Sequence, residues 1–105
     1  MIWHKVEEIN NPFIHDAVLL CTLKGMSLRS VYMDQNGELA IRFNGKLSEQ
    51  DIAFCLDCFN PYSNAETRLD NIHPINMVDY VIQNDHQDGY STEIYSQEGI
   101  DYRNL

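Results

Sequence analysis

The dipeptide Asn36-Gly37 lies between two runs of alternating apolar and polar residues, LRSVYMD at 28–34 and ELAIRF at 38–43. Such alternation is typical of strands that bury one face. Asn and Gly both tolerate positive φ, so this pair favours a type I′ turn between antiparallel strands. The sequence therefore predicts a β-hairpin over residues 28–43, around which the rest of the chain must fold.

Two further elements flank the hairpin. The segment IHDAVLLCTL at 14–23 is rich in aliphatic and β-branched residues, and we interpret it as a buried strand. A helix is predicted over about 49–59, because Ser48 and Asp51 fit a capping box at its start. This helix ends before Asn60-Pro61, since proline disfavours helical geometry in the preceding residue.

The segment MVDYVIQ at 77–83 fits both a helical and a strand pattern, and we favour a strand. The reason is that a turn at 85–89 and an alternating segment at 90–96 follow it. Residues 60–74 are expected to form a loop with a helical turn around 65–69, and the tail 99–105 is expected to be poorly ordered. The predicted fold is one α+β domain over 1–105, an antiparallel sheet of about four or five strands with one main helix on one face.

The segment AFCLDCF at 53–59 holds a Cys-x-x-Cys pair, which occurs in zinc sites, in redox couples and in ordinary cores. On the predicted helix, Cys55 belongs to an apolar stripe whose members are Ile52, Cys55, Leu56 and Phe59. A free cysteine in such a position behaves as a small hydrophobic residue. We therefore expect Cys55 to lie in the core.

Zinc and redox chemistry both fit the Cys55–Cys58 pair poorly. Zinc needs two more ligands, and His73 and His86 are separated by twelve residues where three to five are usual. A redox pair normally opens a helix, whereas this pair falls in its second half beside Asp57, which would raise the thiol pKa. We expect no metal, no cofactor and, with three cysteines in total, free thiols in a reducing compartment.

No segment combines a nucleophile, a base and an orienting group in a recognisable catalytic pattern. The acidic segment NDHQDG at 84–89 lacks the alternating ligand positions of a calcium loop. Phosphate-binding glycine loops do not occur in the sequence. We therefore expect a binding protein rather than an enzyme.

The net charge of −9 arises entirely in the second half of the chain. Residues 1–46 carry five acids and five bases, whereas residues 47–105 carry eleven acids and two bases. Nucleic-acid grooves need clustered Lys and Arg, which the sequence does not offer, so we expect no direct binding of nucleic acid. No apolar run approaches the ~20 residues of a membrane span, and no secretory signal begins the chain. We expect a cytoplasmic protein.

The segment 79–102 mixes these acids with four of the six tyrosines. Tyrosine is enriched at interface hot spots, and surrounding acids steer encounter with a basic partner. We predict that this segment binds a basic protein, such as a nuclease-type toxin blocked by an immunity protein or antitoxin. The predicted contact residues are Asp79, Tyr80, Asp85, Asp88, Tyr90, Glu93 and Tyr95.

Three alternatives stay open. A phage-encoded inhibitor of host defence, such as an anti-CRISPR protein or a DNA mimic, would use the same acidic surface on a different partner. An enzyme or small-ligand protein would need a concave pocket with convergent polar groups. An assembly subunit would present a large apolar contact surface. The sequence does not fix the oligomeric state.

Overall fold

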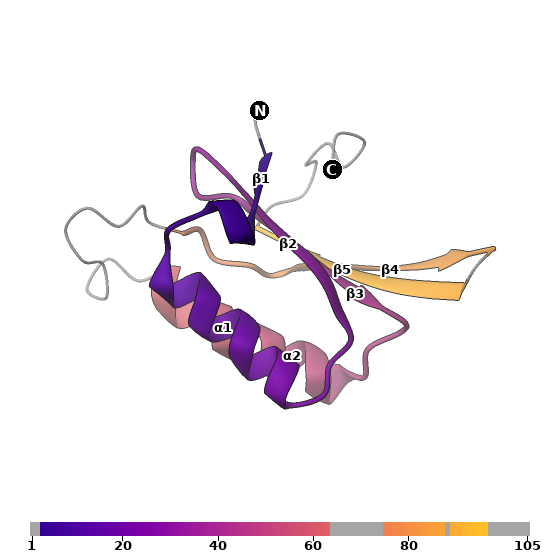
Figure 1. The fold of residues 1–105 in the computed structure, drawn as a ribbon. Coiled ribbons are helices and arrows are strands. Elements are labelled where there is room, and N and C mark those ends of the chain that lie inside the picture. Colours follow the sequence, from indigo (N-terminus) through magenta and orange to yellow (C-terminus); the bar gives the residue numbers. More distant parts are fainter. Residues whose placement is uncertain (1–2, 64–74, 88, 97–105) are drawn as a thin grey trace.

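The computed structural model describes residues 3–63, 75–87 and 89–96. Within these ranges, five strands form one antiparallel sheet in the order β1-β2-β3-β5-β4. The strands are β1 (Trp3–Lys5), β2 (Leu28–Asp34), β3 (Leu39–Asn44), β4 (Tyr80–His86) and β5 (Gly89–Tyr95). Two α-helices, α1 (Pro12–Leu23) and α2 (Glu49–Phe59), lie side by side on one face of the sheet (Figure 1). The predicted α+β fold is confirmed.

The hairpin of β2 and β3 is present, but its turn differs from the predicted one. Gly37 donates its backbone N–H to the carbonyl of Asp34 (3.2 Å), which makes Gln35 and Asn36 the central residues of the turn. Gly37 follows with φ 83°, a conformation that favours glycine. The carboxylate of Asp34 favours this arrangement, because its Oδ1 accepts the backbone N–H groups of Asn36 (2.9 Å) and Glu38 (2.8 Å).

The strand predicted over 14–23 is wrong, because these residues belong to α1. The side chain of Asn11 caps the helix, its Oδ1 accepting the backbone N–H groups of Phe13 (3.0 Å) and Ile14 (3.2 Å). Pro12 occupies the first helical position, where its missing N–H costs nothing and its fixed φ suits the helix. The sheet gains a strand elsewhere, since β1 pairs with β2 through Lys5 and Tyr32.

The helix predicted over 49–59 is confirmed as α2. Ser48 accepts a hydrogen bond from the backbone N–H of Asp51 at 3.1 Å, the arrangement expected of a helix N-cap. After α2 the chain passes into a 3₁₀ turn, η2 (Asn60–Ser63); an earlier one, η1 (Val6–Glu8), joins β1 to α1. No helix in the described residues is long and apolar enough to cross a membrane.

The ambiguous segment 77–83 becomes a strand only from Tyr80 onward, and residues 75–79 have no regular secondary structure. Asn60 holds the segment 75–79, which leads into β4, in place. Its Nδ2 donates to the carbonyl of Val78 (2.9 Å), and its Oδ1 accepts the N–H of the same residue (2.7 Å). The helical turn predicted around 65–69 and the tail 99–105 lie outside the described residues.

The main core fills the space between the sheet and the two helices. Val31, Ile41 and Ile94 are aligned across β2, β3 and β5, and all three are buried in it. A second cluster lies on the opposite face of the sheet, which we call the outer face. There Ala40 and Tyr95 are fully buried. The side chains that pack against them are Trp3, Tyr32, Tyr80 and Ile82.

Candidate functional site

The residues predicted to bind a partner do not form one surface. Tyr80 and Tyr95 are directly opposite each other in the β4–β5 ladder, and both belong to the outer face. Glu93 alternates with the buried Ile94 and therefore also faces outward. Asp85 and Tyr90, in contrast, form a cross-strand pair on the face that carries the helices.

Two of the predicted contact residues are buried and form hydrogen bonds with other residues of the chain. Glu93 is 9% exposed and Tyr95 is 0% exposed. The Tyr95 hydroxyl donates to Glu93 Oε2 at 2.6 Å, Asn84 Nδ2 donates to the same oxygen at 3.3 Å, and Arg42 Nε lies 3.6 Å from Glu93 Oε1. Glu93 therefore serves as the acceptor at the centre of an outer-face polar network, and neither it nor Tyr95 forms an open contact surface.

This network also changes the acidity of Tyr95. Burial raises the pKa of its phenol, and the hydrogen bond to Glu93 raises it further, while Arg42 opposes both effects. The hydroxyl consequently stays protonated and continues to donate to Glu93 throughout the physiological range.

Asp85 and Tyr90 lie near the far end of the β4–β5 hairpin, which extends beyond the helical layer (Figure 1). Because the helices do not reach this end, Tyr90 is 51% exposed, and Asp85 is exposed as well. Asp79 is also exposed, in the segment before β4, where its N–H donates to the carbonyl of Tyr95. Asp88 lies outside the described residues.

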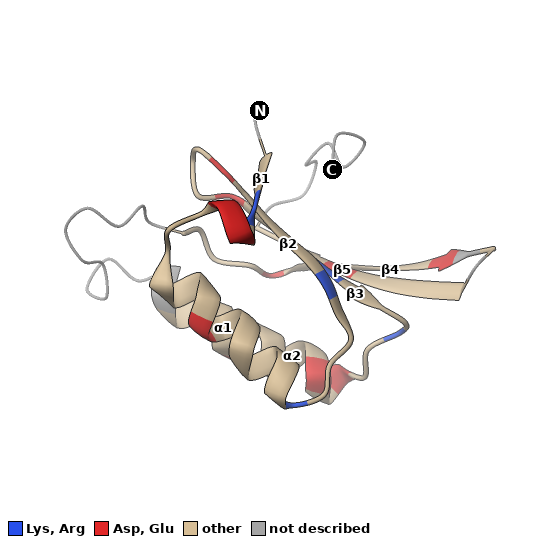
Figure 2. Ribbon diagram, in the orientation of Figure 1, with Lys and Arg blue, Asp and Glu red and all other residues tan. Residues whose placement is uncertain are grey.

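The acidic residues in the described part of the chain are spread over several elements (Figure 2). Glu7 and Glu8 lie on η1, and Asp16 lies on α1. Glu49 and Asp51 occupy the first turn of α2, where negative charge stabilises a helix. Some of the acidic residues therefore stabilise a helix and are explained without a partner. Five further acids of the second half lie outside the described residues, namely Glu66, Asp70, Asp88, Glu98 and Asp101.

The three cysteines meet between α1 and α2, a contact that sequence spacing did not reveal. Cys21, Cys55 and Cys58 are free and buried, which confirms the core position predicted for Cys55. Hydrogen bonding with the Cys55 thiol lowers the pKa of Cys21, whereas contact with Cys21 and burial raise that of Cys55. Burial and the neighbouring Cys21 raise the pKa of Cys58 to about 11. No group of three or more His, Cys, Asp or Glu in the described part of the chain is arranged to hold a metal ion.

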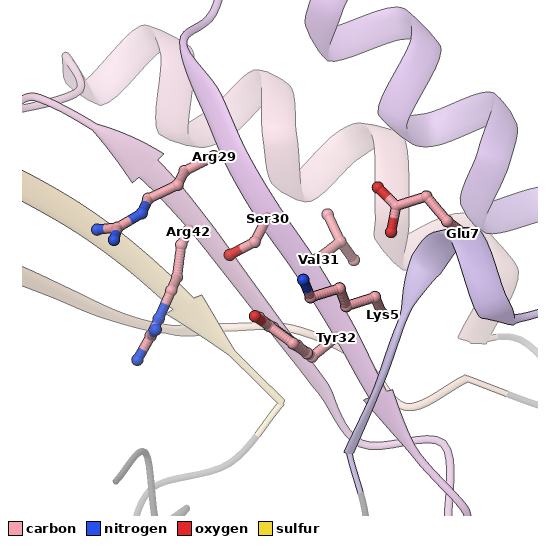
Figure 3. A pocket seen from close by; sticks show the side chains of 7 residues that line it. All are labelled: Lys5, Glu7, Arg29, Ser30, Val31, Tyr32 and Arg42. Carbon is pink, nitrogen blue, oxygen red and sulfur yellow. The ribbon is translucent and has the colours of Figure 1, made fainter. Parts of the chain in front are cut away.

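A polar pocket of about 300 Å³, which we call the outer-face pocket, lies where β1 ends beside β2. Three of the chain's seven Lys and Arg residues line it, and the sequence separates them widely: Lys5, Arg29 and Arg42. Ser30 and Tyr32 add hydroxyl groups between them (Figure 3). Residue spacing does not reveal this cluster, because its members come from three different strands.

Comparison with known proteins gives no assignment. No protein-family model, no curated protein and no solved structure matches the chain.

Proposed function

We propose that this chain is a small cytoplasmic inhibitor that binds and occludes a basic protein. The partner class that fits best is a nuclease-type toxin, which makes the chain an immunity protein or antitoxin. The observation that carries this proposal is the exposed pair of Asp85 and Tyr90 near the projecting end of the β4–β5 hairpin. The protein would block its partner by covering it, without chemistry of its own.

The Asp85–Tyr90 pair has the composition of an interface anchor. Tyr90 offers a large, stiff surface with a polar tip and loses little conformational entropy when it is held. Asp85 lies directly across the ladder from it, so a cation that stacks on or beside the tyrosine also meets a carboxylate. A projecting hairpin can enter the concave surface of a partner, as a flat sheet face cannot.

The charge of the chain supports a basic partner. A net charge of −9 on 105 residues raises the encounter rate with a positively charged surface and opposes binding to polyanions. Nucleases carry such positive surfaces because they must hold phosphate backbones. A carboxylate-bearing hairpin in that groove would compete with the substrate.

The proposed contact surface is narrower than the seven residues predicted from sequence. It keeps Asp85 and Tyr90, whereas Asp79, although exposed, precedes β4 at the other end of the hairpin and is not part of this surface. Glu93 and Tyr95 are not part of this surface. To reach a partner they would have to break their buried hydrogen bond, which would leave the Glu93 carboxylate without this donor. Substitutions at these two positions would affect folding before they affected binding.

Capture experiments test this proposal. The purified chain is immobilised, exposed at low salt to a source-organism lysate cleared of nucleic acid with an immobilised nuclease, and eluted in salt steps. We expect one basic protein to be retained to moderate salt, and its nuclease activity to fall when the free chain is added. Tyr90→Ala should weaken retention about tenfold or more, as for a hot-spot tyrosine.

Two exposed positions away from the hairpin provide matched controls. Leu23→Ala removes a large side chain that is 74% exposed on α1, and Asp57→Asn removes an exposed carboxylate on α2. Both should leave retention unchanged. The proposal fails if no basic protein is retained above low salt, or if the two controls lower retention as much as Tyr90→Ala does.

A further inference from the structure

The outer-face pocket brings together positive charge in a chain that is strongly negative overall. We infer that it binds the phosphate group of a small molecule, through Lys5, Arg29 and Arg42 with the hydroxyls of Ser30 and Tyr32. This site is independent of the hairpin surface proposed above. It lies on the other side of the sheet and uses different residues.

A β-bulge places Arg29 in the pocket. The pairing of β2 with β3 shifts register between Leu28 and Ser30, so Arg29 is the extra residue of the bulged strand. Regular alternation would direct Arg29 to the helix-bearing face, since Ser30, its neighbour, faces outward opposite Arg42. A bulge re-aims side chains at such a point. Figure 3 shows the guanidinium groups of Arg29 and Arg42 on the same side of the Ser30 and Tyr32 hydroxyls.

The end of β1 supplies the third cation. Lys5 is the last residue of β1 and lies directly opposite Tyr32 in the ladder. Beyond Lys5 the chain turns into η1, so no described strand covers β2 from Leu28 to Val31 on that side. The Lys5 ammonium extends back over β2 toward the hydroxyls of Ser30 and Tyr32 (Figure 3). The hydroxyls thus lie between the Lys5 ammonium on one side and the two guanidinium groups on the other.

The cations of the pocket keep unused binding capacity. Within the described residues, neither Lys5 nor Arg29 forms an ion pair with a carboxylate. The Nε of Arg42 is buried 3.6 Å from Glu93 Oε1, so a ligand would meet the other N–H groups of its guanidinium. A guanidinium has five N–H donors, so Arg42 can hold Glu93 on one side and a ligand on the other.

Two carboxylates lie near the pocket and leave it positive. Glu93 is engaged by Arg42 and by the Tyr95 hydroxyl. Glu7 also lines the pocket, but its carboxylate lies well away from the two guanidinium groups in Figure 3. The donors that remain are ammonium, guanidinium and hydroxyl groups, which together match the several acceptor oxygens of a phosphate.

Size and net charge select a small ligand. Ligand pockets span about 300 to 1,000 Å³, and this pocket of about 300 Å³ lies at the small end of that range. A nucleic-acid strand would bring many phosphates against a chain of net charge −9 and is disfavoured. A single phosphate, free or on a small ester, meets only the local positive field.

An NMR titration of the ¹⁵N-labelled full chain tests this site with inorganic phosphate, ribose 5-phosphate and sodium chloride at matched ionic strength. We expect saturable shifts for the amides of Lys5, Arg29, Ser30 and Arg42 with both phosphates, and none with chloride. Tighter binding of ribose 5-phosphate would assign an ester as the ligand, and equal binding would assign free phosphate.

Substitutions distinguish phosphate binding in the pocket from nonspecific attraction of phosphate to any cation on the chain. Arg29→Gln and Lys5→Gln change exposed side chains and should each weaken phosphate binding about tenfold, as for a lost charge-assisted hydrogen bond. Lys46→Gln, an exposed cation after β3, should leave the affinity unchanged. The inference is overturned if phosphate causes no saturable shift, or if Lys46→Gln weakens binding as much as Arg29→Gln does.

Discussion

The hydroxyl of Tyr95 donates a hydrogen bond of 2.6 Å to Glu93 Oε2, and both side chains are buried on the outer face of the sheet. This contact joins the aromatic cluster around Tyr95 to the polar network of Arg42 and Glu93. An antiparallel sheet often leaves one face to solvent. Here the second face has its own small core, so it contributes to stability.

Replacing Tyr95 by Phe should destabilise the fold. The substitution keeps the ring but removes the donor, which leaves the buried carboxylate of Glu93 with fewer hydrogen bonds. We expect a loss of about 1 to 3 kcal/mol in the free energy of unfolding, measured by urea denaturation. Tyr90→Phe, at an exposed tyrosine, is the control and should change little. Equal stability of Tyr95→Phe and the wild type would contradict the role of this contact.

Asn60 should be needed to hold the chain that leads into β4. Its side chain satisfies both the N–H and the carbonyl of Val78, a residue with no exposed surface. Asn60→Ala leaves both backbone groups without these partners, and we expect it to lower the free energy of unfolding by about 2 kcal/mol. Asn44→Ala, at an exposed position, serves for comparison in the same denaturation assay. A similar small effect of both substitutions would refute this assignment.

Stability should fall in alkaline solution because of Cys58. Burial raises the pKa of its thiol from an ordinary value near 9 to about 11, so the folded state favours the protonated form. This contribution is fully present below pH 9 and is lost as the pH rises through 11. Cys58→Ala should therefore show a smaller drop in unfolding free energy between pH 8 and pH 10.5 than the wild type. The same drop in both proteins would argue against the raised pKa.

The cap of α1 gives a further test. Asn11 is 2% exposed, and its side chain accepts two backbone N–H groups at the start of the helix. Asn11→Ala should cost about 1 kcal/mol of stability, with a loss of helical signal in circular dichroism on mild heating. Asn10→Ala changes an exposed neighbour and should have no comparable effect. An unaltered thermal midpoint in Asn11→Ala would mean that the cap contributes nothing.

The sequence predicted the elements whose signals are local. The β2–β3 hairpin and α2 follow from alternation, from the turn and from the Ser48 cap. Helix α1 was missed because apolar residues lie on both of its faces, with Leu19, Leu20 and Leu23 exposed opposite the buried residues, so no helical stripe stands out. Weighing the Asn11-Pro12 cap signal above the aliphatic run would have given the correct helix.

The candidate sites were less accessible from sequence. Lys5, Arg29 and Arg42 meet only through the strand order and a bulge, neither of which leaves a mark in residue spacing. The burial of Glu93 and Tyr95 depends on side chains that pack from neighbouring strands of the outer face. Composition identified an acidic, tyrosine-rich segment, but only the register shows that its residues divide between two faces.

The most direct test of the central claim is the association rate of the chain with its captured basic partner, measured by stopped-flow fluorescence at several salt concentrations. If the hairpin end is the contact surface, Asp85→Asn should slow association at low salt and flatten its dependence on ionic strength, because a steering charge is lost. Asp57→Asn should leave both unchanged. An association rate for Asp85→Asn equal to that of the wild type at low salt would contradict the claim.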